Sequence, residues 1–201
     1  MGSNASFSDL VELIVRLRDP VAGCPWDRAQ DHASLRPYLI EEAYEAISAI
    51  DGGDPDALAC ELGDVLLQVL LHSQIASEQG QFSIDDVIDG LADKLTRRHP
   101  HVFGDAPGDL ASVHRRWEEI KAAENHVPGT LPILVRARKT ISALAREGRS
   151  ELIVEEALGC SPEARAGAKL LCVIDEIWRE GLDPELALRK ALDRLSEKAD
   201  T

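Results

Sequence analysis

The sequence predicts an all-α protein built as a bundle of helices, and three observations support this class. Apolar residues recur with a 3.6-residue period along nearly the whole chain. No stretch has the two-residue alternation of a confident strand, and the links between the periodic stretches are short. Short links favour antiparallel neighbouring helices.

Composition bounds the kind of protein. Its 201 residues fit one domain or one and a half, and 44% hydrophobic with 29% charged residues is typical of a soluble globular chain. With only 4% aromatic residues, the core must consist mainly of Leu, Ile, Val and Ala. The net charge of -14 argues against a nucleic acid polymer or an anionic membrane as partner, but allows a small anionic ligand bound locally.

The expected compartment is the cytoplasm. The four cysteines lack the spacing of a zinc or redox motif, so we expect reduced thiols. The N-terminus lacks the pattern of a cleavable signal, and the longest apolar run, "VLLQVLL", is too short to span a bilayer.

The first part of the chain is expected to hold five helices. They span residues 9–17, 34–50, 54–80, 83–99 and 110–124. Capping residues mark three of the starts: Ser34, Asp54 before Pro55, and Ser83 with Asp86 in a capping box. Residues 18–27 and 101–109 are expected to be loops, because Pro and Gly interrupt the helical pattern there.

A boundary is expected near "NHVPGTLP", residues 125–132. It divides a module at residues 7–124 from a helical segment at 129–201, whose helices span 133–147, 162–181 and 183–198. Residues 165–195 weakly echo 61–95, with Ala166 opposite Glu61 and Lys169 opposite Asp64. The segment is therefore either a degenerate second module without these acids, or the echo is a coincidence between two amphipathic segments.

Two of the expected helices carry a concentration of carboxylates. Glu41, Glu42 and Glu45 share one arc of the first, which taken alone would be a solvated acidic face. On the second, a narrow stripe holds the polar side chains and apolar residues cover the rest of the surface. The stripe consists of Glu61, Asp64, Gln68 and His72.

Such a stripe needs a partner, because buried unpaired carboxylates are costly and repel one another. A divalent cation removes both problems, and carboxylate oxygens suit Mg²⁺ first and Mn²⁺ second. A ferritin-like di-iron site would need Glu-x-x-His, whereas the chain has Glu-x-x-Glu and Glu-x-x-Asp. The alternative that stays open is a solvated acidic face.

Cations that could hold phosphates follow in the chain. Lys94, Arg97 and Arg98 lie together near one helix end, and Trp117 is one turn before Lys121. Each alone is more simply a surface charge or a packing aromatic residue. Trp26, in a Gly/Pro-rich stretch, could stack on a base or plug the end of the bundle.

Taken together, these segments resemble the MazG family of nucleoside triphosphate pyrophosphohydrolases. The resemblance covers about residues 7–124, through "LRDPVAGCPWDRAQDHASLRPYLIEEAYE", "ELGDVLLQVLLHSQIASEQGQF", "DKLTRRHPHVF", Trp117 and Lys121. It implies the all-α NTP pyrophosphohydrolase fold, a homodimer or higher oligomer, and Mg²⁺-dependent hydrolysis of an NTP or dNTP to the monophosphate and pyrophosphate. A role in cleaning the nucleotide pool would follow.

The resemblance also implies residue roles. The metal-binding acids are Glu42, Glu45, Glu61 and Asp64, while Glu41 binds metal or orients water. The substrate-binding positions are Lys94, Arg97 or Arg98, Trp117 and Lys121. In the mechanism that we expect, Glu41 or Glu45 activates a water and Lys94, Arg98 and Lys121 stabilise the leaving pyrophosphate.

The chain departs from two-module relatives after about residue 128, which implies one active site per chain. Two other classes of function stay open. One is a regulatory module that binds metal and nucleotide without turnover, and the other is a purely structural helical partner. Base and sugar preference are left open.

Overall fold

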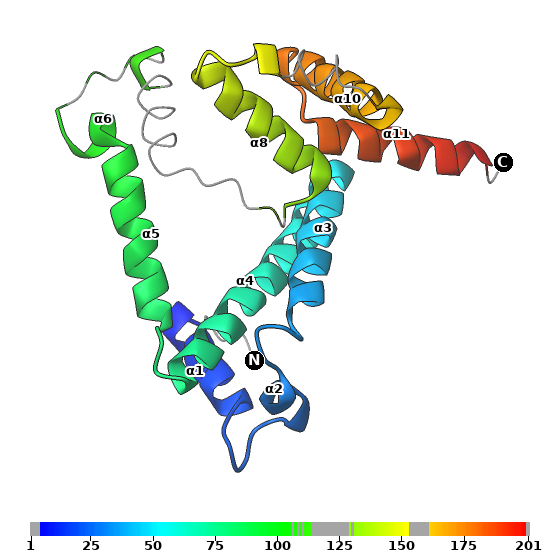
Figure 1. Cartoon of the computed structure of the whole chain (residues 1–201). Helices are drawn as coiled ribbons and strands as arrows, with labels where there is room; N and C mark the ends of the chain where they lie inside the picture. The colour runs from blue at the N-terminus through cyan, green and yellow to red at the C-terminus, as the bar shows by residue number, and fades with distance from the viewer. Residues whose placement is uncertain are drawn as a thin grey trace. The chain divides into compact units, whose positions relative to one another are not determined.

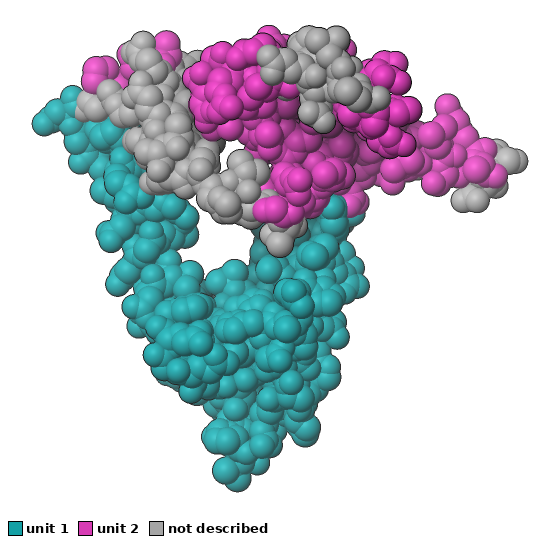
Figure 2. Space-filling model, viewed as in Figure 1, with its two compact units in different colours: residues 1–106 teal, residues 107–201 magenta. Residues whose placement is uncertain are grey.

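A computed structural model of the chain describes residues 5–105, 107, 109, 111–113, 129, 131–152 and 161–199. The chain divides into two compact units, residues 1–106 and residues 107–201 (Figure 2). Every regular element in the described residues is a helix, so the predicted all-α class is confirmed. Most of the predicted boundary at 125–132 and most of the predicted helix 110–124 lie outside the described residues.

The first unit is organised around a helical hairpin. Its elements are α1 (Phe7–Leu17), α2 (Pro25–Ala29), α3 (Arg36–Gly52), α4 (Pro55–Glu78), α5 (Ile84–Arg98) and α6 (Pro100–Phe103). Helices α3 and α4 pack antiparallel along their lengths, and α1 packs against α4 (Figure 1). Helix α5 meets α4 near their connection and then diverges from the hairpin toward α6 (Figure 1).

Local sequence signals explain where most of these helices begin. Asp54 caps α4 by accepting the backbone N–H of Asp56 at 2.9 Å. Ser83 and Asp86 form the predicted capping box of α5, with the Ser83 N–H donating to Asp86 Oδ2 at 2.7 Å. Gly53 has a φ of 70°, the left-handed conformation that ends α3 and that glycine adopts without strain.

The predicted cap at Ser34 is wrong. Helix α3 begins after Leu35, which already has right-handed helical angles, and its start has no side-chain cap. The Asp31 carboxylate instead accepts the N–H groups of Ala33 and Ser34, so the turn satisfies its own donors. Two short helices, α2 and α6, also replace predicted loop, because proline at a first helical position favours a helical turn.

The core of the first unit gathers on the C-terminal half of α4. Ile14, Leu35, Leu70, Leu71 and Ile75 form the buried cluster. The half of the hairpin near its turn is different, since Ile50 is 59% exposed and Leu62 is 53% exposed. The sequence predicted that the nearly all-apolar α4 would be buried in a core or an interface, and within one chain only its second half is buried.

By length and mean hydropathy alone, α4 is also long and apolar enough to cross a membrane. The length of its longest apolar run had not predicted this. The core helix of a soluble protein passes the same test. Glu61 and Asp64 lie within this helix, and its C-terminal half carries the buried core of the unit. A core helix explains these features.

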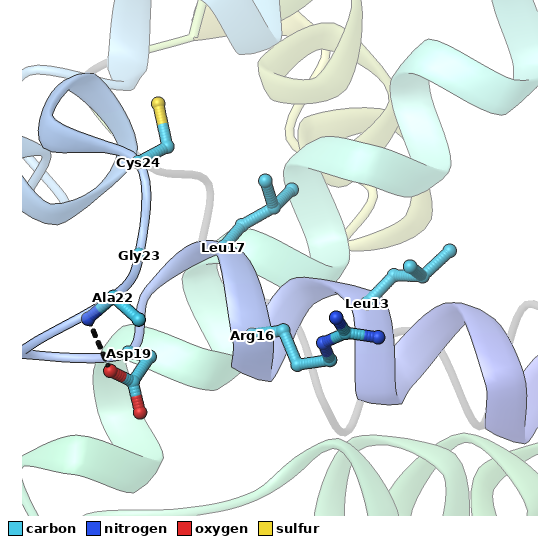
Figure 3. Close-up of a pocket in the computed structure, with 7 residues that line it drawn as sticks. All are labelled: Leu13, Arg16, Leu17, Asp19, Ala22, Gly23 and Cys24. Atoms are coloured by element: carbon cyan, nitrogen blue, oxygen red, sulfur yellow. Dashed lines mark hydrogen bonds between the residues drawn. The ribbon is translucent and has the colours of Figure 1, made fainter.

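The loop after α1 folds back tightly on that helix. The Asp19 carboxylate accepts the Ala22 N–H at 2.7 Å (Figure 3). The Cys24 N–H donates to the Leu17 carbonyl at 2.8 Å. A Cβ at Gly23 would lie 2.5 Å from two backbone oxygens, so only glycine fits. A cavity of about 420 Å³ lies beside this loop, and none of the predicted site residues lines it.

A buried ion pair joins this loop to the end of α4. The Arg18 side chain, 6% exposed, donates to both carboxylate oxygens of Glu78, at 2.9 and 2.7 Å. It also donates to the carbonyls of Asp27 and Gln30. One guanidinium therefore connects α1, the segment around α2, and α4.

The second unit contains three described helices. They are α8 (Ile133–Arg146), α10 (Pro162–Arg179) and α11 (Pro184–Ala199), and they confirm the three helices predicted there. Ile141 and Ile174 form its buried cluster, and the Arg138 guanidinium lies 4.4 Å from the centre of the Trp178 ring. This unit is an amphipathic helical assembly with a small core.

The Arg18–Glu78 pair generates a prediction about stability. Glu78→Gln should lower the free energy of unfolding at pH 7 by about 2 kcal/mol, because it leaves the buried guanidinium with a neutral partner. The hydrogen bonds from Arg18 lower the pKa of Glu78. The pair's contribution is therefore complete above the ordinary glutamate pKa and is lost as pH falls through the lowered value.

Denaturant unfolding of both proteins from pH 7 to pH 3 measures this difference, which should shrink toward acid. The matched control is Glu147→Gln, which removes an exposed ion pair with Arg149 and should cost less than about 0.5 kcal/mol. An equal loss in both variants, or a difference independent of pH, would contradict the prediction.

Candidate metal and nucleotide site

Three carboxylates from two helices converge on the α3–α4 hairpin. Glu42 and Glu45 come from α3 and Glu61 from α4, and one oxygen from each lies within 4.8 Å of the others. Antiparallel packing produces this meeting, because Glu42 and Glu45 are one turn apart and face the first half of α4. The structure therefore brings together three of the four predicted metal-binding acids.

The fourth acid, Asp64, lies beside this group. It raises the pKa of both Glu42 and Glu61 by charge repulsion. Glu41 raises the pKa of Glu42 in the same way, so all five predicted acids belong to one electrostatic cluster.

Two acids of the cluster, Glu42 and Glu61, have raised pKa values. Burial is the largest cause of the raised pKa of Glu42, followed by the charges of Asp64, Glu45, Glu41 and Glu61. Burial also comes first for Glu61, whose pKa is further raised by the charges of Glu45 and Asp64 and by a hydrogen bond with Glu45. These carboxylates would gain from an added positive charge.

Gln68 continues the stripe toward the core. Its side chain is buried, with 4% exposure, and its Oε1 has no hydrogen-bond partner among the described residues. It lies one turn after Asp64 on the same face of α4. A buried acceptor next to a carboxylate cluster fits a hydrated cation nearby.

The donor set fits a hard divalent ion. It offers only carboxylate oxygens, from side chains close enough for several to meet one ion. The pKa values of Glu42 and Glu61 are raised by burial and by mutual repulsion. A divalent cation bound among the carboxylates would offset that repulsion. Exposed acidic groups also occur without an ion, so the fit rests on the convergence from two helices and on the repulsion within it.

The predicted cations lie elsewhere in the first unit. Lys94, Arg97 and Arg98 occupy the C-terminal end of α5, the end that diverges from the α3–α4 hairpin (Figure 1). Within one copy of the unit, the structure does not bring them to the acidic cluster. The predicted substrate-binding residues Trp117 and Lys121 lie outside the described residues.

Trp26 packs against an aromatic residue that sequence reasoning missed. The Trp26 and Tyr38 rings pack edge to face, with centroids 5.7 Å apart and planes at 81°, and Trp26 remains 49% exposed. Tyr38 lies on α3 one turn before Glu41 and Glu42. The i, i+3 and i, i+4 spacing from Tyr38 to the acids was the sequence signal that could have identified Tyr38. This spacing places a half-exposed aromatic pair next to the acids.

Comparison with known proteins decides the family. Residues 30–103 match the MazG nucleotide pyrophosphohydrolase domain, a range that contains all five acids. The chain is 42% identical to a Thermotoga maritima protein named nucleoside triphosphate pyrophosphohydrolase/pyrophosphatase MazG, over 96% of this chain and 83% of that protein. The chain belongs to the MazG family.

Other relatives are longer than this MazG chain. It is 43% identical to an Escherichia coli K12 protein named nucleoside triphosphate pyrophosphohydrolase, over 69% of this chain and 57% of that one. It is 51% identical to the Bacillus subtilis protein YabN, described as uncharacterized, over 66% of this chain and 29% of that one. The identity to the Thermotoga protein spans both units of this chain.

Because the carboxylates of the cluster repel one another, removing one of their charges should have opposite effects on thermal stability with and without metal. Glu42→Gln should raise the melting temperature of the metal-free protein at pH 8, because it removes a charge that the fold disfavours. Since the pKa of Glu42 is raised, the metal-free wild type should likewise gain stability as pH falls from above that value toward the ordinary glutamate pKa. With Mg²⁺ the wild type should be stabilised and the variant much less so.

Thermal melts in EDTA and in Mg²⁺ or Mn²⁺ test this crossover. Glu12→Gln, an exposed acid of α1, is the matched control and should follow the wild type in both conditions. If Glu42→Gln responded to the metal as strongly as the wild type, Glu42 would not be a ligand.

Proposed function

We propose that this MazG protein is a nucleoside triphosphate pyrophosphohydrolase that uses Mg²⁺, with Mn²⁺ as a substitute. It hydrolyses an NTP or dNTP between the α- and β-phosphates to a nucleoside monophosphate and pyrophosphate. The observation that carries the proposal is the meeting of Glu42, Glu45 and Glu61 from two helices within the matched family domain. The names of the relatives support the same activity.

The acids have different roles in the proposed site. Glu42, Glu45, Glu61 and Asp64 hold the metal, which supplies Lewis-acid polarisation of a phosphoryl oxygen and neutralises substrate charge. Glu41, which acts on the cluster from its edge, orients a water and accepts its proton, with Glu45 as the alternative base. Trp26 and Tyr38 offer a ring edge and faces on which a nucleobase can stack.

Cations complete the site in a homodimer or higher oligomer. Lys94, Arg97 and Arg98, with Trp117 and Lys121, bind the phosphates and stabilise the leaving pyrophosphate. The separation of α5 from the acids within one unit supports a site in which a second copy supplies these residues (Figure 1). Exposed apolar side chains on the hairpin and on α5, including Ile40, Leu62 and Leu91, supply an interface for that copy.

The remaining features of the proposal follow from charge and chain organisation. Residues 7–124 form the catalytic module. Residues 129–201 form a degenerate second module, in which Ala166 and Lys169 stand at the positions of Glu61 and Asp64, and this leaves one active site per chain. The net charge of -14 favours a small nucleotide over a nucleic acid polymer or a membrane as partner. The protein works in the cytoplasm, where it removes unwanted nucleotides from the pool.

The alternative is a regulatory module that binds metal and nucleotide without turnover. Within one unit the cations on α5 lie apart from the acids, and this separation favours a regulatory module if no second copy completes the site. It predicts the same metal response as the enzyme but no release of pyrophosphate.

The activity itself is the first prediction of this proposal. Pyrophosphate release from a panel of NTPs and dNTPs should require Mg²⁺, stop in EDTA, and fall at least about 100-fold in Asp64→Ala without loss of the fold. Glu12→Gln serves as the control that should retain full activity. No release from any nucleotide by a folded protein that binds Mg²⁺ would favour the regulatory module.

A mixing experiment tests the completion of the site by a second copy. Asp64→Ala and Lys94→Ala should each be inactive alone. After subunit exchange, a dimer that contains one of each has one site with both changes and one site with neither. The mixture should therefore recover about a quarter of the wild-type rate. No recovery, with exchange verified by mass, would place the acids and Lys94 of one site in the same copy.

A further inference from the structure

Two histidines outside the proposed site meet head to head. His32 precedes α3 and His72 lies on α4, and their Nδ1 atoms are 2.8 Å apart. The ring planes differ by 6° and the centroids are 5.1 Å apart. The nitrogens are closer than stacked aromatic faces can approach, so the rings lie end to end and share a hydrogen bond in their common plane.

This geometry determines the protons of the pair. One ring must carry its proton on Nδ1 and donate, and the other must keep Nδ1 bare and carry its proton on Nε2. A first added proton goes to the free Nε2 of the donor ring, and the hydrogen bond is kept. A second added proton occupies the accepting Nδ1, which removes the hydrogen bond and leaves two adjacent positive charges.

The pair connects the two helices that carry the acids. His32 is three residues before Leu35, which is fully buried in the core and directly precedes α3. His72 follows Leu71, which is buried in the same core. On α4, His72 lies one turn beyond Gln68, which separates it from Asp64. A bond between the histidines therefore holds the segment before α3 against the C-terminal half of α4.

A carboxylate interacts with one ring of the pair, that of His32. Asp31 is adjacent to His32, and its carboxylate accepts the N–H groups of Ala33 and Ser34 and also interacts with the charge of His32. From α1, Arg18 donates to the Gln30 carbonyl and is neutralised by Glu78 of α4. From α3, Arg36 donates to the Ala33 carbonyl.

No carboxylate among the described residues contributes to the shift at His72. Its pKa is lowered first by burial and then by the charge of His32. A lowered histidine pKa means that stability is complete above the ordinary value near about 6.5 and is lost as pH falls through the lowered value.

We propose that His32 and His72 are positioning residues for the acidic site, whose shared proton holds α3 in register with α4 and whose second protonation at mildly acidic pH releases it. A metal ion between the two rings is a poorer explanation, because the nitrogens are too close to coordinate one ion from opposite sides. The effect on turnover rests on the proposed function, whereas the hydrogen bond and its release do not.

Imidazole nitrogen NMR of the intact protein tests the hydrogen bond directly. At pH 7.5 one of the two rings should be in the Nδ1–H form and the other in the Nε2–H form, and both should convert to imidazolium at lower pH in two separated steps. Two Nε2–H rings that titrate independently at ordinary values would overturn the proposal.

Melting curves at pH 7.5 and pH 5.5 test the release. Asparagine places an amide near the position of Nδ1 and cannot titrate in this range. His32→Asn and His72→Asn should each lose less melting temperature between the two pH values than the wild type, by about 2–4 °C. The double variant should add nothing beyond the larger single effect, because both changes remove the same coupling. His101→Asn, on α6, is the matched control and should follow the wild type.

Pyrophosphate release against pH tests the link to the site. The fall in kcat on the acid side should move to lower pH in His32→Asn, with kcat at pH 8 within about twofold of the wild type. An unchanged acid side, with a changed melting profile, would show a structural tie that does not position the acids. If the wild type released no pyrophosphate, the proposed function would fail, while the NMR and melting results would still decide whether the tie exists.

Discussion

Repulsion among carboxylates on the α3–α4 hairpin is the constraint on which the rest of the first unit depends. Two helices that pack along their lengths hold five acids in one electrostatic cluster. Such a hairpin is stable only if other contacts compensate for that charge. The compensation lies at the opposite end of α4, where Leu70, Leu71 and Ile75 form the core and Glu78 pairs with Arg18. Helix α4 therefore has a half that carries the core and a half that carries the acids.

Several contacts hold the hairpin in place at the end of α4 that carries the core. The Arg18 guanidinium gathers the end of α4 and the segment around α2, and Gly23 lets the chain turn back tightly enough to reach it. The His32–His72 hydrogen bond lies between this anchored end and the acids. Each of these hydrogen bonds joins the segment before α3 to α4, so groups outside the acidic cluster hold α3 beside α4.

Helix periodicity, capping and residue type were sufficient to predict much of this protein. The helical class, the caps at Asp54 and Ser83, and the three helices of the second unit depend on neighbours within one or two turns. The grouping of Glu42 and Glu45 with Glu61 was also predictable, because antiparallel packing of two adjacent helices leaves few alternatives. The cap at Ser34 failed because the Ser34 hydroxyl is used in the preceding turn, where it accepts the Asp31 N–H and donates to Gln30 Oε1.

By itself, the sequence determined the helices, the family motif and the acidic faces, since these rest on local periodicity and on residue chemistry. Only the tertiary structure decided which groups meet across the unit. Arg18 and Glu78 are sixty residues apart, and His32 and His72 forty, so no local pattern predicts either pair. The sequence likewise did not predict that α5 diverges from the hairpin. The apolar stripe of α5 indicates a helix, but it does not specify whether that stripe packs within one chain or against another copy.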